Sequence, residues 1–198
     1  MSARTFVVVV ALLAAAGLVA APPAGAATTA VSIQGFGFHP QIVTVAQGDT
    51  VKWTQNDQGT QHTSTSDQGF WHSAKLDTGQ TYSQTSAFKN AGTYHYHCAV
   101  HTDMTGQVKV PLKASGSAGA GWTLRWSSLS STPAQRSFDV QIRRPGSTSW
   151  TAFRTDTKKR KASFNPARTG TYSFRARTRN LSNGKRSDWS PVKQLKIT

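Results

Sequence analysis

The 198-residue sequence contains no glutamate and only one cysteine, and each shortage removes a class of function. Without glutamate, the carboxylate pairs of most glycoside hydrolases are missing, and no Ser–His–Asp order with a nucleophile elbow is present. A single cysteine excludes an intrachain disulfide and every zinc or iron–sulfur site that needs two or more thiolates from one chain. The sequence therefore predicts a protein that is not an enzyme.

Long apolar runs are missing beyond the first 26 residues. Met1–Ala26 carries Arg4, then the apolar run Phe6–Ala20, then a small-residue ending, which together are the parts of a cleavable signal peptide. The apolar run is shorter than the roughly 20 residues that span a bilayer, and an uncleaved anchor is the alternative. We expect a mature chain that begins near Ala27, has no transmembrane segment, and is secreted, periplasmic or associated with the cell envelope.

The remaining sequence is rich in Gly, Ser and Thr, with short runs of Val, Tyr, Phe and Trp between them, as in all-β proteins. Charge divides it unevenly. Residues 27–112 hold four Lys and five Asp, whereas residues 113–198 hold 18 Lys and Arg against three Asp, a net charge of +15. The small-residue stretch 113–121 predicts a flexible linker. We therefore expect two domains, one at 27–112 and the other at 122–198.

In the first domain, alternating β-branched and aromatic residues lie between turn residues. Strands at intervals of about 8–12 residues predict an antiparallel sandwich or barrel. The predicted strands are Ile42–Val45, Thr50–Thr54, Thr81–Ser83, Thr93–Cys98 and Gly106–Val110.

Four soft or borderline metal ligands lie close to these strands. Cys98, His101 and Met104 stand in C-x₂-H-x₂-M spacing after a predicted strand, and His62 lies in an upstream loop. One thiolate, two imidazoles and a thioether favour copper over magnesium, calcium or manganese, and a His₂Cys site with a weak axial Met is the geometry of blue-copper electron transfer. Zinc is the alternative metal, which the Irving–Williams order disfavours in a matched site.

Residues 36–110 resemble a plastocyanin-type cupredoxin, and the spacing of the ligand loop is nearest to that of amicyanin. The matching segments are Phe38-His39-Pro40, Gly48 to Trp53, Asn56-Asp57, His62-Thr63, Gly92-Thr93-Tyr94 and His97-Cys98 through Gly106. The resemblance implies a Greek-key β-sandwich that binds one type 1 copper ion, and a Thr63 that supports the ligand loop by hydrogen bonding. The copper ligands that it implies are His62, Cys98 and His101, with Met104 as the axial ligand.

The resemblance further implies an electron carrier, in which electrons leave through the exposed edge of His101 to redox partner proteins. A two-copper oxidase or nitrite reductase would need a second ligand cluster, and residues 113–198 contain no His and no Cys. Two alternatives remain open. One is a protein that holds or delivers copper, although such proteins more often show repeated Met or His clusters. The other is a cell-surface adhesion protein with structural copper.

The second domain shows its own alternating strands and resembles a fibronectin type III domain. The resemblance rests on an early core Trp126, on Tyr172 as the tyrosine of a tyrosine corner, and on Trp189-Ser190-Pro191 before the last strand. It implies an immunoglobulin-like β-sandwich. The first strand of such a domain falls on the predicted linker, so we expect that strand to be short or missing.

Strand alternation also predicts a basic face on the second domain, because Arg175, Arg177 and Arg179 point outward in one row. Such a face is suited to docking on an anionic cell-envelope polymer or an acidic partner. A solvated face that only keeps the protein soluble is the alternative. Nucleic acid is not an expected partner, since an exported chain without a reading motif rarely meets it.

Overall fold

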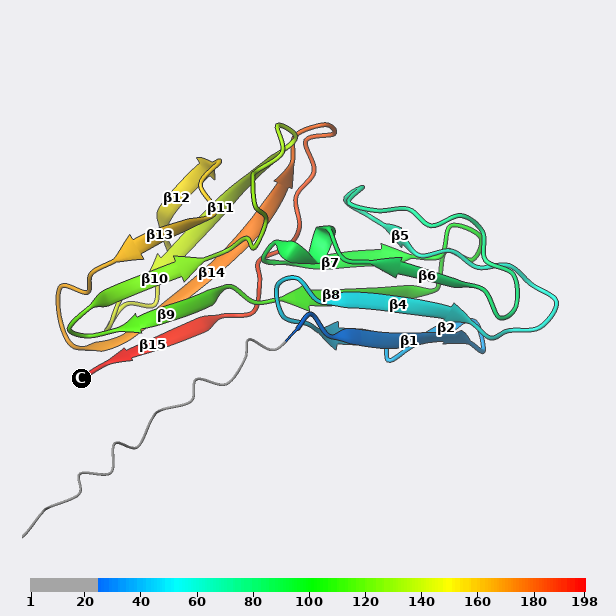
Figure 1. Cartoon of the computed structure of the whole chain (residues 1–198), viewed down its shortest axis with the longest axis horizontal. Helices are drawn as coiled ribbons and strands as arrows, with labels where there is room; N and C mark the ends of the chain where they lie inside the picture. Colours follow the sequence, from blue (N-terminus) through cyan, green and yellow to red (C-terminus); the bar gives the residue numbers. More distant parts are fainter. Residues whose placement is uncertain (1–24) are drawn as a thin grey trace, which may run out of the picture.

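The computed structural model describes residues 25–198, and the predicted signal peptide lies outside them except for its last two residues. Figure 1 shows two β-sandwiches placed end to end, with the C-terminus in the second. The described residues contain one short 3₁₀ helix, η1 (Ala87–Lys89), and no α-helix, which confirms the predicted all-β fold. No helix in this part of the chain is long and apolar enough to cross a membrane.

The first sandwich packs a sheet in the order β2-β1-β4-β6 against a sheet in the order β3-β8-β7-β5. Its strands are β1 (Thr28–Gln34), β2 (Gly37–His39), β3 (Ile42–Thr44), β4 (Thr50–Gln55), β5 (Thr65–Ser66), β6 (Thr81–Gln84), β7 (Gly92–His97) and β8 (Thr105–Val110). The prediction of a purely antiparallel sandwich is wrong for two pairs, since β1 pairs with β4, and β3 with β8, in parallel. Parallel neighbours need a crossover, and here the chain visits the opposite sheet between them.

Aromatic side chains fill the space between these two sheets. Alternation along β4 turns Trp53 inward, where it is fully buried and packs edge-on against Tyr96 of β7 at 5.4 Å between ring centroids. Trp71 and Phe88 pack around the same ring. In Figure 1, β4 and β7 both point away from the second sandwich. The loops that follow these two strands therefore meet at the outer end of the molecule.

The second sandwich packs a sheet in the order β13-β10-β9 against a sheet in the order β12-β11-β14-β15, which confirms the predicted second immunoglobulin-like sandwich. Its strands are β9 (Lys113–Ser117), β10 (Gly121–Arg125), β11 (Arg136–Arg143), β12 (Thr151–Thr157), β13 (Lys161–Phe164), β14 (Gly170–Asn180) and β15 (Lys193–Ile197). Trp126 is buried in its core, as predicted. The hydroxyl of Tyr172 donates a hydrogen bond to the carbonyl of Arg168 at 3.2 Å, the contact that defines a tyrosine corner.

The prediction of a flexible linker over residues 113–121 is wrong. Lys113–Ser117 form β9, which pairs antiparallel with β10 along its whole length, and only Pro111 and Leu112 separate β9 from β8. A composition of small residues predicts a linker. A strand at a sheet edge, however, is held by its backbone hydrogen bonds and needs no large side chains. Leu112 is also buried in the core of the second sandwich.

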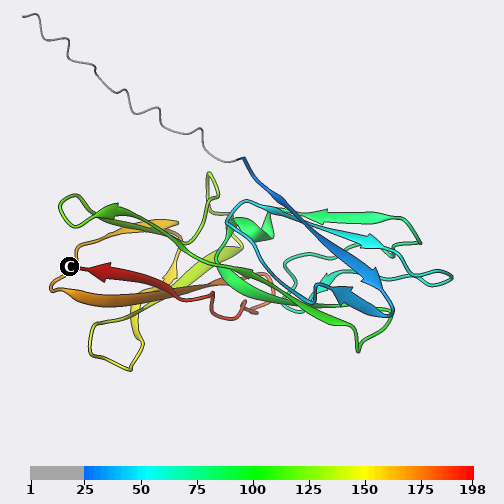
Figure 2. The same ribbon diagram turned by 90° about the horizontal axis from the view of Figure 1, so that it is seen from below.

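The two sandwiches lie against each other in both views of Figures 1 and 2, and hydrogen bonds join them. Thr93 and Asp188 exchange two backbone hydrogen bonds of 3.0 and 2.9 Å. The buried hydroxyl of Thr178 donates to the carbonyl of Ala91 at 3.0 Å and accepts from the hydroxyl of Tyr94 at 3.1 Å. Each of these contacts joins the start of β7, or the residue before it, to the second sandwich.

We expect Thr178→Val to lower the free energy of unfolding by about 1–3 kcal/mol, because the buried carbonyl of Ala91 loses its side-chain donor without a change in shape. Urea denaturation followed by tryptophan fluorescence measures the change. Thr171→Val, at an exposed position on the same strand, is the matched control. Equal midpoints for both variants would show that the interface hydrogen bond contributes nothing.

Candidate metal centre

Two segments bring the predicted ligands to the outer end of the first sandwich. His62 lies between β4 and β5, where its backbone exchanges hydrogen bonds of 3.1 and 2.8 Å with Leu76. Cys98 follows the last residue of β7, and its amide donates to the carbonyl of Met104 at 3.0 Å. The amide of Met104 in turn donates to the carbonyl of His101 at 3.1 Å, which closes the loop into a compact turn.

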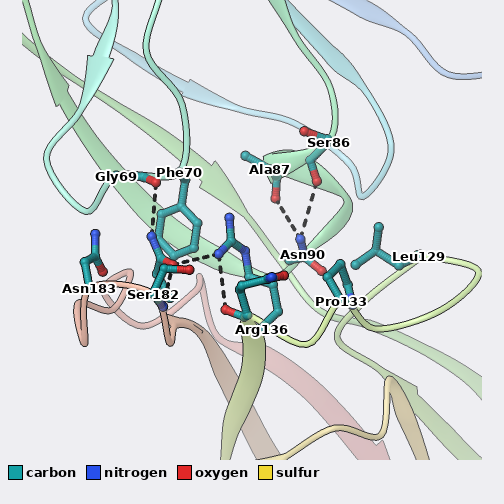
Figure 3. A pocket seen from close by; sticks show the side chains of 12 residues that line it. Gly69, Phe70, Ser86, Ala87, Asn90, Leu129, Pro133, Arg136, Ser182 and Asn183 are labelled. Carbon is teal, nitrogen blue, oxygen red and sulfur yellow. Dashed lines mark hydrogen bonds between the residues drawn. The ribbon is translucent and has the colours of Figure 1, made fainter.

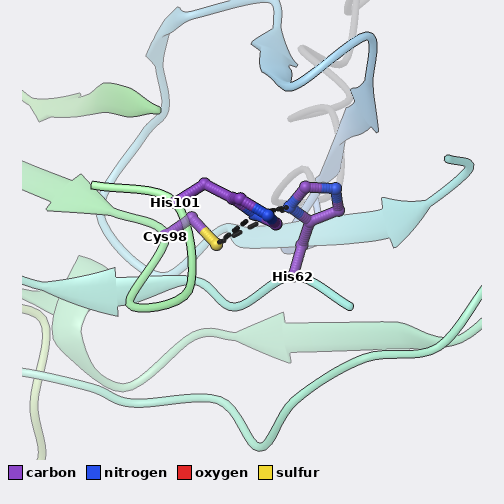
Figure 4. Close-up of side chains that lie close together, drawn as sticks. All are labelled: His62, Cys98 and His101. Atoms are coloured by element: carbon purple, nitrogen blue, oxygen red, sulfur yellow. Dashed lines mark hydrogen bonds between the residues drawn. The ribbon is translucent and has the colours of Figure 1, made fainter. Parts of the chain in front are cut away.

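The side chains of His62, Cys98 and His101 converge on one point, as Figure 4 shows. The Sγ atom of Cys98 lies 3.6 Å from Nδ1 of His62 and 3.9 Å from Nδ1 of His101, and the two Nδ1 atoms are 3.1 Å apart. Cys98 and His62 are fully buried, and Met104 is 3% exposed. Within residues 25–198, no other three His, Cys or Asp side chains bring their donor atoms this close together.

The donor set fits a copper ion. Metal–nitrogen bonds of about 2.0 Å separate two ligands in a trigonal plane by about 3.5 Å, close to the spacings among these three atoms. Both imidazoles present the same nitrogen to the thiol, and the buried Met104 supplies a thioether from the same loop. Two imidazoles, a thiolate and a thioether are the ligands of type 1 copper.

Asp57 holds His62 in the orientation that metal binding requires. Its carboxylate lies 3.0 Å from Nε2 of His62, so Nε2–H donates to the carboxylate and Nδ1 is left with its lone pair toward the thiol. Burial lowers the pKa of His62, and the neighbouring His101 lowers it further, against the opposing effect of Asp57. A neutral imidazole, the form that binds metals, is therefore favoured at this position.

The same carboxylate holds an exposed turn over the two histidines. Gly35 and Phe36 have φ values of 57° and 54°, as in the two-residue turns that join twisted hairpins. A phenylalanine rarely adopts this left-handed conformation. Asp57 accepts hydrogen bonds from both amides, at 2.6 and 3.1 Å. Burial opposes its ionisation, but these bonds and His62 outweigh it and hold the pKa of Asp57 below its ordinary value.

Phe36 and Val100 are exposed apolar residues that each adjoin the half-buried His101, one in space and the other in sequence. Phe36 is 58% exposed and meets the ring of His101 edge to face at 5.0 Å, and the ring of His62 at 5.6 Å. Val100, which precedes His101 in the chain, is 41% exposed. Sequence reasoning missed the roles of Phe36 and Asp57. The Gly35-Phe36 pair between two short strands was the available signal for the turn.

Thr63 supports the ligand loop as the family resemblance implied. Its hydroxyl accepts a hydrogen bond of 2.7 Å from the amide of Ala99, and its own amide donates to Sγ of Cys98 at 3.3 Å. The exposed Asp103 lies within the ligand loop without joining the donor cluster. The ligand loop is therefore held both by its own backbone and by the segment that carries His62.

The predicted basic row lies outside this centre, on β14 of the second sandwich. Arg175, Arg177 and Arg179 alternate with buried residues, as the sequence predicted. Arg175 stacks between the rings of Trp150 and Trp189, at 4.3 and 4.8 Å from their centroids.

The other two arginines of the row have carboxylate partners. Arg177 pairs with Asp139 at 3.0 Å, and Arg179 pairs with Asp156 at the same distance. Much of the charge in the row is therefore balanced within the second sandwich. Sequence alternation could not reveal this, because the acidic partners come from β11 and β12.

The fold and the donor cluster define a copper-site domain of the cupredoxin type, and the family comparison agrees. Residues 5–110 match the family model described as a cupredoxin-like domain, more than half of the chain. The chain therefore belongs to the cupredoxin-like family, whose members bind copper. No curated protein matches the chain.

Several solved structures are similar to part of the chain. The reduced Cu(I) form of an amicyanin variant is 30% identical over 46% of this chain and 86% of its own, with a TM-score of 0.38. The purple cupredoxin from Nitrosopumilus maritimus is 24% identical over 41% of this chain and 97% of its own, with a TM-score of 0.38. The copper-containing nitrite reductase from Thermus scotoductus SA-01 is 25% identical over 43% of this chain, with a TM-score of 0.39, and only 22% of its length is covered.

Proposed function

We propose that this chain is an exported blue-copper protein that carries one electron at a time between partner proteins, without catalysing a reaction of its own. The observation that carries the proposal is the convergence of Cys98 Sγ with the Nδ1 atoms of His62 and His101 beneath an exposed apolar surface. Bound copper supplies a one-electron couple between its Cu(II) and Cu(I) forms. Export is supported by the signal-peptide pattern at 1–26.

The chain's own residues hold the ligand atoms in place. Backbone hydrogen bonds fix His62 to Leu76 and Cys98 to Met104, and Asp57 fixes the ring of His62. Burial of Cys98 and His62 excludes water from the donors. A site that moves little when its charge changes is suited to repeated electron transfer rather than to release of the metal.

Electrons would enter and leave through the edge of His101, which the sequence resemblance implied as the exit. Phe36 and Val100 beside it form an apolar contact surface for a redox partner. The partner proteins themselves are to be identified by their electron transfer with this chain.

Two variants distinguish a residue that tunes the reduction potential of the copper, Met104, from one that binds the metal strongly, His62. Met104→Gln should keep the copper and lower the reduction potential, because the thioether is the long, weak ligand of such sites. His62→Ala should weaken copper binding itself, since it removes a buried strong ligand. Voltammetry and metal analysis on both variants measure this. Equal copper loss from the two would reverse the assigned roles.

The same voltammetry distinguishes the two other functions that the sequence left open. An electron carrier gives a reversible one-electron response and keeps its copper in both oxidation states. A protein that delivers copper would release the metal on reduction. A copper ion with only a structural role would show no reversible one-electron response in the range of biological redox partners.

For the second sandwich, we propose a fibronectin type III-like domain that docks the copper domain on an anionic cell-envelope polymer or an acidic partner. Its support is the net charge of +15 in residues 113–198. The half-buried row Arg175, Arg177 and Arg179 would contribute, together with a cavity of about 530 Å³ lined only by basic residues. These residues are Arg125, Lys158, Lys159, Arg160 and Lys161.

Binding to an anionic polymer should fall steeply between 0.1 and 1 M salt, because the Debye length shrinks from about 10 to about 3 Å. Retention on immobilised polyanion measures this for the full chain. A Lys159→Gln, Lys161→Gln variant and the triple Arg→Gln variant of the row should each elute at lower salt. The matched control replaces Lys52 and Lys75, two exposed lysines of the first sandwich, by Gln and should elute at the same salt concentration as the unchanged chain. If the full chain is not retained at low salt, the positive charge of residues 113–198 serves only to keep the protein soluble.

A further inference from the structure

A separate cavity lies where the two sandwiches meet, near the start of β7, whereas the metal centre follows its end. Its volume is about 450 Å³, within the range of about 300–1,000 Å³ that is usual for small-molecule sites. The first sandwich contributes Phe70 and Asn90 to its wall, and the second contributes Arg136 and Ser182 (Figure 3). Gln135 of the second sandwich also lines the cavity. None of these residues has a role in the proposed copper function.

The half-buried guanidinium of Arg136 is held in the wall of this cavity on one side only. Its face packs over the ring of Phe70 at 4.8 Å from the centroid. Its Nη1 donates to Oδ1 of Asn180 at 2.8 Å and to the carbonyl of Gln135 at 3.3 Å. Its Nε and Nη2 have no hydrogen-bond partner within residues 25–198. These two nitrogens form the edge with which arginine binds a carboxylate through two parallel hydrogen bonds.

No carboxylate of the described residues balances this charge. The cavity wall contains no Asp, and Arg136 forms no ion pair within residues 25–198. Burial lowers the pKa of Arg136, which shows that its charged form loses hydration at this position. Arginine nevertheless keeps its proton in proteins. A half-buried positive charge with an open fork of donors can receive an anion.

The other polar groups of the cavity indicate what kind of anion would fit. Asn180 and Asn90 use their amides within the protein, since Asn180 donates to the carbonyls of Gln68 and Gly69, and Asn90 accepts from Ser127. The amide of Gln135 and the hydroxyl of Ser182 have no side-chain partner in the described part of the chain. Both residues are exposed at the mouth of the cavity. They can hydrogen-bond to hydroxyl groups beside a carboxylate.

We propose that this cavity binds a small hydroxy-carboxylate, such as a sugar acid, with its carboxylate on the Nε–Nη2 edge of Arg136. Gln135 and Ser182 bind the adjoining hydroxyls, and Phe70 supplies an apolar floor. A purely structural role for Arg136, as a link between the sandwiches, accounts for its contacts with Phe70 and Asn180. It does not account for the open Nε–Nη2 edge, which makes no contact with either residue's polar atoms. A bound ligand bridges the two sandwiches and stabilises their interface.

Calorimetric titration of the full chain with D-glucuronate and with D-glucose tests the proposal, because the two sugars differ in the carboxylate. We expect glucuronate to bind and glucose to bind at least about tenfold more weakly. Arg136→Gln should reduce glucuronate affinity by about tenfold or more. Arg154→Gln is the matched control, since Arg154 also stacks on a phenylalanine ring but lies outside the cavity.

A second variant keeps the test decisive if Arg136→Gln fails to fold. Gln135→Glu leaves Arg136 in place and adds a carboxylate at the exposed mouth, where it competes with the ligand for the open edge. It should fold normally and lose glucuronate binding. Equal binding of glucuronate and glucose would overturn the proposal. No binding of glucuronate at about 10 mM, or full binding of glucuronate by Gln135→Glu, would overturn it as well.

Discussion

Replacing Cys98 by serine should abolish the intense visible absorption of the copper-loaded protein and leave the fold intact. The band arises from charge transfer between a thiolate and Cu(II), and Cys98 is the only cysteine of the chain. Serine is close in size, and its oxygen can still accept the hydrogen bond that the amide of Thr63 gives to Sγ. Absorption spectra of the two proteins at equal copper content measure the loss.

Met104→Gln is the matched control for this substitution, because it changes a ligand in the same loop and keeps the thiolate. Its band should shift but stay intense. A serine variant that remains blue would place the thiolate outside the copper site. A wild-type protein that stays pale with stoichiometric copper would disprove the site assignment as a whole.

Removing the carboxylate of Asp57 should lower copper affinity by about 10–100-fold, although Asp57 is not itself a ligand. Asp57→Ala frees the ring of His62, which is then no longer fixed through Nε2. It also releases the amides of Gly35 and Phe36, whose positive φ values the carboxylate stabilises. Competition titrations with a copper chelator measure the affinity, and amide hydrogen exchange at Phe36 reports on the turn.

Asp103→Ala is the control for the loss of negative charge, because Asp103 is exposed and lies in the ligand loop. It should leave the affinity within a factor of about two, as expected for a solvated charge. Unchanged affinity in Asp57→Ala would mean that the backbone alone orients His62. Equal effects in both variants would point to net charge rather than to positioning.

Local sequence predicted most strands because alternation is a property of neighbouring residues. The predicted strands at 42–45, 50–54, 81–83 and 106–110 correspond to β3, β4, β6 and β8. Three strands of the first sandwich were missed: β1, β2 and β5. Strand β9 was read as a linker, since its small side chains carry no alternation and only its pairing with β10 makes it a strand.

The sequence by itself determined the copper ligand set, because three of the four residues share one seven-residue loop and their spacing is a local property. It also determined the outward direction of Arg175, Arg177 and Arg179, which follows from alternation along one strand. Only the tertiary structure decided the environment of these residues. Asp57 reaches the turn at Gly35 and Phe36 across more than 20 positions of the chain.

Tertiary structure also decided how the two halves act together. The cavity at Arg136 exists because Phe70 of the first sandwich and Asn180 of the second, over 100 positions apart, both contact one guanidinium. The charge of the arginine row is balanced by aspartates from other strands. Spacing along a chain specifies the groups that one loop or strand presents, whereas the pairing of distant groups depends on how sheets pack, which no local pattern records.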